Sequence, residues 1–281
     1  MSVNSKREAN LVVVSDLHCG CTLGLHPAKK SRLDEGGFYE PSKLQRIVTE
    51  WWDEFWNNWV PRATNNQPYT VVINGDTLDG VHHRATTQVS QNLSDQAKIA
   101  RTLLEPIVDK CNGRFYMLRG TEAHVGPSGV EEERLAKELG AIPDSIGKHA
   151  RNELWIEVGD WLTHIMHHIG TTGSTHYESS AVMKELAEGY SEAGRWNERA
   201  PDCIVRSHRH RYIKVEVPAD GESNIAVVTP GWQLKTPFTY RIAGGRLTQP
   251  QFGGLLIRQG NEEAHERHKV WSLSRPKSEV V

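Results

Sequence analysis

The feature that most constrains the fold is a set of short apolar runs, each followed at once by polar residues. These runs are rich in β-branched and other apolar side chains, as expected for strands buried in a sheet. They lie at 11–14, 69–73, 115–118 and 203–205. Segments with apolar residues at helical spacing separate them, and further strand-like runs follow. This order predicts an α/β protein with a mixed β-sheet arrangement.

Helical spacing is clearest in the first connecting segment, which carries several tryptophans and has Ser42 as an expected N-cap and Pro61 as a stop. We interpret its aromatic face as packing on a sheet; a partner or base-stacking surface is the alternative. The predicted helices are 42–60, 94–110, 130–139 and 179–191. A hairpin is predicted at 154–166, and later strands at 225–229, 239–242, 255–257 and 270–273.

Length and composition indicate one large globular domain rather than several. The chain has 281 residues, and 24% of them are charged, which is typical of folded and not of disordered proteins. We expect a single domain over 1–281, with a loop and Trp-rich helix inserted at about 19–60 and a β-rich part from about 212. The formal net charge of −2 excludes a nucleic-acid binder that acts by bulk charge alone.

Several cellular destinations are disfavoured by the sequence. No apolar run reaches the roughly 18–20 residues of a membrane span, and the polar N-terminus lacks the apolar region of a signal peptide. The chain has four cysteines, too few for a disulfide scaffold of this length. We therefore expect reduced cysteines, no membrane association and a cytoplasmic location.

Five clusters of Asp, Glu and His follow predicted strands. They lie at 16–18, 75–79, 120–124, 167–168 and 208–210. Ligands bind beyond the carboxyl ends of strands in α/β sheets, so we expect the clusters to converge. If the strands stay extended, Asp16 and His18 share a face, and so do His208 and His210.

The chemistry of these clusters predicts a metal site. Carboxylate and imidazole ligands together suit Mn²⁺, Fe or Zn²⁺ better than Mg²⁺ or Ca²⁺, which prefer oxygen alone. The candidate ligands are too many for one tetrahedral ion. They fit two ions about 3.5–4 Å apart that share a carboxylate.

In this order the clusters resemble the motifs of the calcineurin-like metallophosphoesterases. The matching blocks are Asp16-Leu17-His18, Gly75-Asp76-Thr77-Leu78-Asp79, Gly120-Thr121-Glu122-Ala123-His124, His167 or His168, and Ser207-His208-Arg209-His210. The resemblance implies two mixed β-sheets packed face to face and flanked by helices, with metals at the strand ends. The third and fourth blocks look more like those of bacteriophage-encoded members, which would place the protein in a host cytoplasm.

The resemblance also implies a role for each ligand. Asp16, His18 and His210 would hold the first metal, and Asp76 would bridge the two. His208 would hold the second metal with His167 or His168, of which His167 is preferred because it follows the strand directly. We expect two divalent ions, Mn²⁺ before Fe, Zn²⁺ or Ni²⁺, and in-line attack on phosphorus by a bridging hydroxide.

The third block departs from the family pattern. The family has an Asn ligand where this chain has Thr121, and a hydroxyl is a poorer ligand than an amide oxygen. Glu122 is a better donor in a shifted position, and His124 lies further from Gly120 than the family's His does. His124 would protonate the leaving oxygen or stabilise the transition state, or would itself be a ligand. Asp79 would orient a neighbouring ligand.

Substrate contacts are expected beside these blocks. His83 and Arg119 are the candidate phosphate contacts, the former at the start of a helix if one begins near His82. Trp232 is expected to pack under the site loops, with substrate stacking as the alternative. Two segments are candidates for a local basic rim: one contains Arg206, Arg209 and Arg211, and the other contains Lys29, Lys30 and Arg32. If the strand stays extended, Arg206 shares a face with His208 and His210, while Arg209 and Arg211 lie on the other face.

These observations favour a phosphodiesterase or nuclease. The alternatives are a phosphomonoesterase and a non-catalytic scaffold with this fold. The partner is a phosphoester substrate, with a nucleic acid or nucleotide as the favoured kind. The oligomeric state stays open.

Overall fold

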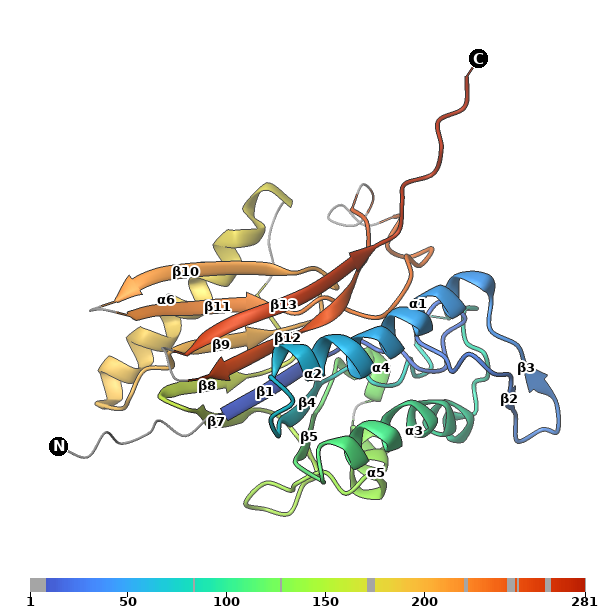
Figure 1. Cartoon of the computed structure of the whole chain (residues 1–281). Helices are drawn as coiled ribbons and strands as arrows, with labels where there is room; N and C mark the ends of the chain where they lie inside the picture. Colours follow the sequence, from blue (N-terminus) through green and yellow to red (C-terminus); the bar gives the residue numbers. More distant parts are fainter. Residues whose placement is uncertain are drawn as a thin grey trace.

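The protein folds into two mixed β-sheets packed face to face, with helices on both outer sides, in agreement with the expected fold class (Figure 1). The structure is a computed structural model. It describes residues 9–82, 84–126, 128–170, 175–219, 222–241, 246, 248–260 and 264–280.

The first sheet has six strands and carries the parallel core of the fold. In spatial order they are β13 (His265–Ser272), β12 (Gln251–Gln259), β1 (Ala9–Val14), β4 (Thr70–Asn74), β5 (Phe115–Leu118) and β6 (Ala150–Arg151). From β1 to β6 the strands are parallel, whereas β12 and β13 add to the sheet in antiparallel fashion. The carboxyl ends of β1, β4 and β5 therefore lie at one edge of the sheet.

The second sheet has five strands. In spatial order they are β10 (Ile213–Ala219), β11 (Glu222–Val228), β9 (Cys203–Arg206), β8 (Trp161–Ile165) and β7 (Leu154–Val158). The central strand β9 is parallel to both β8 and β11, and the two edge strands are antiparallel to their neighbours. Its parallel strands β8 and β9 also end in predicted site clusters.

Side-chain alternation explains why the sheets pack against each other. In β1, Leu11 and Val13 enter the core between the sheets, while Val12 and Val14 enter the core beneath the helices. Each of these four side chains is 0–1% exposed. A strand that is apolar on both faces must be covered on both, which gives the layered architecture.

Helices cover the outer faces. On the first sheet lie α1 (Lys43–Glu54), a π-helical turn η1 (Phe55–Trp59), α2 (Val60–Ala63), α3 (Leu93–Lys110) and α5 (Val130–Glu138). On the second sheet lies α6 (Glu178–Trp196), which contacts β10 and β11. The short elements are β2 (Ser31–Arg32), β3 (Phe38–Tyr39), α4 (Glu122–Val125) and the 3₁₀ turn η2 (Thr175–Tyr177). None of the described helices combines the length and apolar character needed to cross a membrane.

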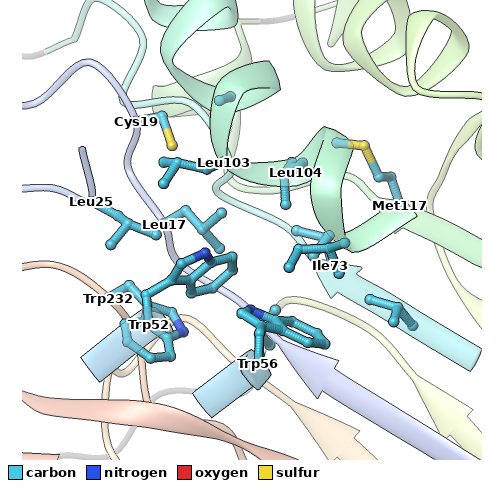
Figure 2. Packing of buried hydrophobic residues seen from close by; sticks show 14 of the residues in the cluster. Leu17, Cys19, Leu25, Trp52, Trp56, Ile73, Leu103, Leu104, Met117 and Trp232 are labelled. Atoms are coloured by element: carbon cyan, nitrogen blue, oxygen red, sulfur yellow. The ribbon is translucent and has the colours of Figure 1, made fainter. Parts of the chain in front are cut away.

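The aromatic helix packs on the sheet, as interpreted from its sequence. Its N-terminus is closed by Ser42 and Gln45, which form a reciprocal capping box. Figure 2 shows Trp52 and Trp56 of this helix beside Trp232, and all three are at most 2% exposed. The rings of Trp52 and Trp232 meet edge to face at 4.9 Å. Trp232 also donates its backbone N–H to the Asp16 carbonyl, so this core supports the end of β1.

Three local predictions are wrong. Pro61 does not stop the aromatic helix, which continues through α2 to Ala63, because a proline is tolerated in the first turn of a helical segment. The predicted strand at 239–242 is a series of turns over its described residues 239–241, because Pro237 and the Thr236 hydroxyl, which accepts the Thr239 N–H, favour a turn. No helix begins at His82; the next helix, α3, begins at Leu93.

Candidate metal centre

The predicted clusters meet beyond the ends of five strands. Asp16 follows β1, Asp76 follows β4, and Thr121 follows β5 in the first sheet. His167 and His208 follow β8 and β9 in the second sheet. The centre therefore lies where the two sheets present their carboxyl ends to one another.

The backbone of these residues is not extended. Five ligand candidates have left-handed φ angles: Asp16 (56°), His18 (46°), Asp76 (49°), His208 (72°) and His210 (52°). The expectation that strand alternation aligns them is therefore wrong; tight turns after the strands bring them together. Such a conformation costs about 1–3 kcal/mol for each non-glycine residue, and it persists where the surroundings enforce it.

Two glycines make room for this convergence. A Cβ on Gly75 would lie 2.5 Å from His167 Nδ1, and one on Gly120 would lie 2.0 Å from an Asp76 oxygen. Neither position accepts a side chain without moving a ligand candidate. The glycines of the second and third blocks are thus required by close packing around the centre.

The first ligand group contains Asp16, His18 and His210. His210 Nε2 lies 3.2 Å from Asp16 Oδ1 and also 3.2 Å from His18 Nε2. Asp16 and His18 are buried, while the side chain of His210 is 23% exposed. Three donor atoms thus face one point.

The second ligand group contains Asp16, Asp76, His167 and His208. Asp76 Oδ2 lies 3.1 Å from His167 Nε2 and 3.8 Å from His208 Nδ1, and His167 Nε2 lies 4.0 Å from Asp16 Oδ1. Asp16 belongs to both groups, whereas Asp76 belongs to the second group alone. The expected role of Asp76 as the shared carboxylate stays a prediction.

His167 and His168 differ in position. His167 is buried and belongs to the second group, which matches the preference given to it. His168 is exposed and belongs to none of the ligand groups found among the described residues. Its ring lies 5.2 Å from that of His167 and 5.7 Å from that of His208, so it flanks the centre.

Each carboxylate uses one oxygen as an anchor and leaves the other for the centre. Asp16 Oδ2 accepts hydrogen bonds from the Ser15 hydroxyl at 2.5 Å and from the His208 N–H at 3.2 Å. Asp76 Oδ1 accepts the Thr121 N–H at 2.6 Å. The remaining Asp16 oxygen, Oδ1, is buried and accepts no hydrogen bond from the described residues. These anchors fix both carboxylates before any ligand binds.

The donor set fits divalent metal ions. Atoms bound to an ion at about 2.1 Å are themselves about 3.0–3.4 Å apart, close to most of the spacings seen here. Two imidazole nitrogens at 3.2 Å repel each other unless a proton or a cation lies between them. The carboxylate and imidazole donors are those preferred by Mn²⁺, Fe and Zn²⁺.

In the metal-free centre, a protonated histidine compensates the charge of the carboxylates. Burial acts to raise the pKa of Asp76, but His167 outweighs it and holds that pKa well below its usual range. Burial acts to lower the pKa of His167, but Asp76 outweighs it and raises it to about 10. The metal-free centre therefore holds a proton on His167 where a metal ion would otherwise compensate the carboxylate.

A third group, His18, Asp79 and His124, adjoins the first. Asp79 Oδ1 lies 3.3 Å from His18 Nδ1, which leaves His18 Nε2 for the centre. Gln88 donates to the other Asp79 oxygen at 2.9 Å. This arrangement places Asp79 where an orienting residue is needed.

His124 is oriented by the backbone. Its Nδ1 lies 2.7 Å from the Asp79 carbonyl oxygen, which can only accept, so Nδ1 carries the proton. Its Nε2 then faces the centre, 3.9 Å from Asp76 Oδ2. Burial, together with His18, lowers the pKa of His124 to about 4, so the ring is neutral at pH 7 in the metal-free protein.

The second half of the centre is tied to a buried polar network between the sheets. The Asn74 carbonyl accepts from His167 Nδ1 at 2.7 Å, which directs His167 Nε2 to the centre. The Asn74 amide donates to the Ser207 hydroxyl at 2.7 Å, and Ser207 contacts Thr229 at 2.7 Å. The ligands of the two sheets are thereby held in register.

Glu132 is a site residue that the sequence analysis missed. It is fully buried on α5, and its two oxygens accept the Thr77 and Gly120 N–H groups at 2.9 Å each. Burial raises the pKa of Glu132 to about 7. Its helical spacing with Leu135 and Ala136 was a usable signal, because it places an acid on the buried face of a charged helix.

Neither of the two expected substrate contacts is confirmed. His83 lies outside the described residues. The Arg119 guanidinium donates to the carbonyl oxygens of Ala150 at 3.0 Å and Ser128 at 3.5 Å. Its role as a phosphate contact stays a prediction.

The three arginines around the last block do not form the expected basic rim. Arg206 is buried and pairs with Glu185 of α6 at 2.8 Å, which contradicts its expected place beside the histidines. Arg209 donates to the Gly170 carbonyl, and Arg211 pairs with Glu178. The partners of all three arginines lie on α6 or at Gly170 in the loop before it, so these arginines hold that part of the chain.

Comparisons with known proteins give a likeness of the fold only. No protein-family model matches the chain, and no curated protein matches it. Among solved structures it is similar to Vacuolar Protein Sorting 29 from Cryptosporidium parvum, with 12% identity, a TM-score of 0.36 and coverage of 95% of this chain and 99% of that one.

Two further similar structures are described as phosphoesterases. A predicted phosphoesterase from Streptococcus pneumoniae has 10% identity and a TM-score of 0.33, over 95% of this chain and 99% of that one. A metallophosphoesterase from Sphaerobacter thermophilus has 9% identity and a TM-score of 0.35, over 95% and 89%. Likenesses at this level assign no activity, so the function must be argued from the side chains.

Proposed function

We propose that this chain is a phosphoester hydrolase that uses two divalent metal ions, Mn²⁺ before Fe, Zn²⁺ or Ni²⁺. The observation that carries the proposal is the pair of ligand groups that share Asp16. In this reading Asp16, His18 and His210 hold one ion, and Asp76, His167 and His208 hold the other with Asp16.

The metal ions would supply a nucleophilic water at neutral pH and would neutralise charge on the phosphate. Two carboxylates balance only half of the charge of two divalent ions, so the loaded centre attracts an anion. The side chain of His208 is 44% exposed, whereas Asp16 and Asp76 are at most 1% exposed. This difference indicates that a substrate would approach from the His208 side.

His124 is the proposed proton donor. Its protonated Nδ1 is held by the Asp79 carbonyl, so only Nε2 can exchange a proton with the substrate. The approach of a phosphate group adds negative charge, which raises the pKa of the ring from its low value in the metal-free protein. The ring can then take up a proton at Nε2 and deliver it to the leaving oxygen.

A diester is the favoured substrate. Among the described residues, the ion-pair partners of Asp16, Asp76 and Asp79 are all histidines, with no lysine or arginine. A phosphomonoester dianion carries more charge than a diester and gains more from such cations. A centre that relies on its metal ions therefore suits the singly charged diester, including those of nucleic acids and nucleotides.

The test compares two esters after metal reloading. The protein is stripped with chelator, reloaded with Mn²⁺, and assayed on bis-nitrophenyl phosphate and nitrophenyl phosphate. We expect diester turnover that Asp76→Asn abolishes and that the exposed-site control Asp109→Asn retains. Preference for the monoester would overturn the diester assignment. No turnover of either ester with both ions bound would contradict a hydrolase.

A further inference from the structure

The Thr121 side chain does not cap the helix that begins beside it. Thr121 is the N-cap residue of α4, where a threonine hydroxyl ordinarily accepts an N–H from the first turn. Here no such side-chain bond is made. The hydroxyl points instead to the second ligand group.

Three ligand atoms surround this hydroxyl at similar distances. Thr121 Oγ1 lies 3.1 Å from His208 Nδ1, 3.2 Å from Asp76 Oδ2 and 3.3 Å from His167 Nε2. Asp76 Oδ2 itself lies 3.1 Å from His167 Nε2 and 3.8 Å from His208 Nδ1. Five of the distances among these four atoms are thus between 3.1 and 3.8 Å.

These spacings match those of ligand atoms around one metal ion. Ligand atoms at about 2.1 Å from one ion are about 3.0–3.4 Å apart. We infer that the Thr121 hydroxyl is a further protein ligand of the second metal ion, beside Asp76, His167 and His208. The inference rests on the proposed function, because it assumes that the centre binds metal.

The backbone fixes the hydroxyl in this position. The Thr121 N–H donates to Asp76 Oδ1 at 2.6 Å, and the neighbouring Gly120 N–H donates to Glu132 at 2.9 Å. Both bonds involve main-chain atoms and survive replacement of the Thr121 side chain. A substitution at position 121 can therefore remove the hydroxyl while the loop stays in place.

The chemistry of a hydroxyl has a consequence for the second ion. A neutral hydroxyl oxygen is a weaker donor than a carboxylate or an imidazole, and Thr121 is the least basic member of its set. The second ion should therefore be held less tightly than the first. The two halves of the centre would fill in sequence, with the one containing His18 and His210 first.

The experiment is a calorimetric Mn²⁺ titration of stripped protein, supported by electron paramagnetic resonance of the bound ions. The variants are Thr121→Val, which has the same shape without the hydroxyl, and Thr121→Ser, which keeps the hydroxyl. The matched control is Thr163→Val, a buried threonine on β8 in the core between the sheets. Thermal melting of each metal-free variant checks folding.

Wild type should bind two ions in two steps. In Thr121→Val the affinity for the second ion should fall roughly tenfold to a hundredfold, with the first unchanged. Thr121→Ser and Thr163→Val should resemble wild type. Two ions bound equally well by Thr121→Val and wild type would overturn the inference and leave the proposed hydrolase intact. Wild type that binds no Mn²⁺ would instead contradict the metal centre itself.

Discussion

The two halves of the centre are built differently. In the first half, Asp16 and His18 are buried, and His18 is held against Asp79. In the second half, His208 is 44% exposed and Thr121 is partly exposed, although His167 is buried and anchored to Asn74. The first half thus has the closed surroundings of a firmly held ion, and the second has the access that a substrate needs.

The largest effect should come from the residue that both halves share. Asp16→Asn removes a charged oxygen from both ligand groups, so both ions should bind weakly and turnover should fall roughly a thousandfold. Metal content by mass spectrometry and kcat on the diester are the measurements. Asp109→Asn is the control; retention of both ions by Asp16→Asn would show that the halves are independent.

His124 should separate chemistry from metal binding. His124→Ala should lower kcat about a hundredfold, because a proton donor is lost, while both ions stay bound. A pH–rate profile should lose the limb that reports the donor. A fall in metal content of the same size would mean that His124 is a ligand instead.

The second half should bind its ion in competition with a proton. His167 has a pKa raised to about 10 in the metal-free protein, so it is protonated below that pH and must lose the proton to bind metal. Affinity at the second half should therefore rise about tenfold per pH unit between pH 7 and 9. Titrations in two buffers with different ionisation enthalpies measure the released proton. Equal heats in the two buffers would count against this displacement.

The smallest effect concerns Glu132, which supports the second half from below. Glu132→Gln presents an amide N–H₂ to one of two backbone N–H groups, so the free energy of unfolding should fall by about 1–3 kcal/mol. The pKa of Glu132 is raised from 4.5 to about 7 in the folded state. Its stabilising contribution is thus complete below about pH 4.5 and is lost as pH rises through 7.

The cost of Glu132→Gln should accordingly shrink from pH 5 to pH 8. Urea unfolding of the metal-free wild type and variant at both pH values gives the difference. A cost that is the same at both pH values would show that the buried carboxyl does not titrate in this range.

The layered fold could be predicted from the sequence because its strands and helices carry strong patterns. Val12 and Val14 on one face of β1, and Leu11 and Val13 on the other, already indicate a strand covered on both sides. The aromatic helix and α3 also follow their periodicity. The strand expected at 239–242 failed because a short run with Thr and Tyr satisfies strand preference while Pro237 sets a turn.

The sequence identifies which residues are ligand candidates, but it does not predict how they are arranged in space. Blocks such as Asp16-Leu17-His18 identified the residues, but not their left-handed backbone, in which the N–H groups of Asp16 and His18 donate to the carbonyls of Gly75 and Asp76 in the loop after β4. Thr121 was noted as a departure, but its closeness to His208, which is 87 residues away, is a tertiary fact. The same is true of Glu132, whose partners belong to two other loops.

The most direct test of the central claim is anomalous X-ray diffraction from crystals soaked in Mn²⁺. The account predicts two anomalous peaks about 3.5–4 Å apart, one beside His18 and His210 and the other beside His167 and His208, with Asp16 or Asp76 between them. A single peak, or none, at full Mn²⁺ saturation would contradict a two-metal centre.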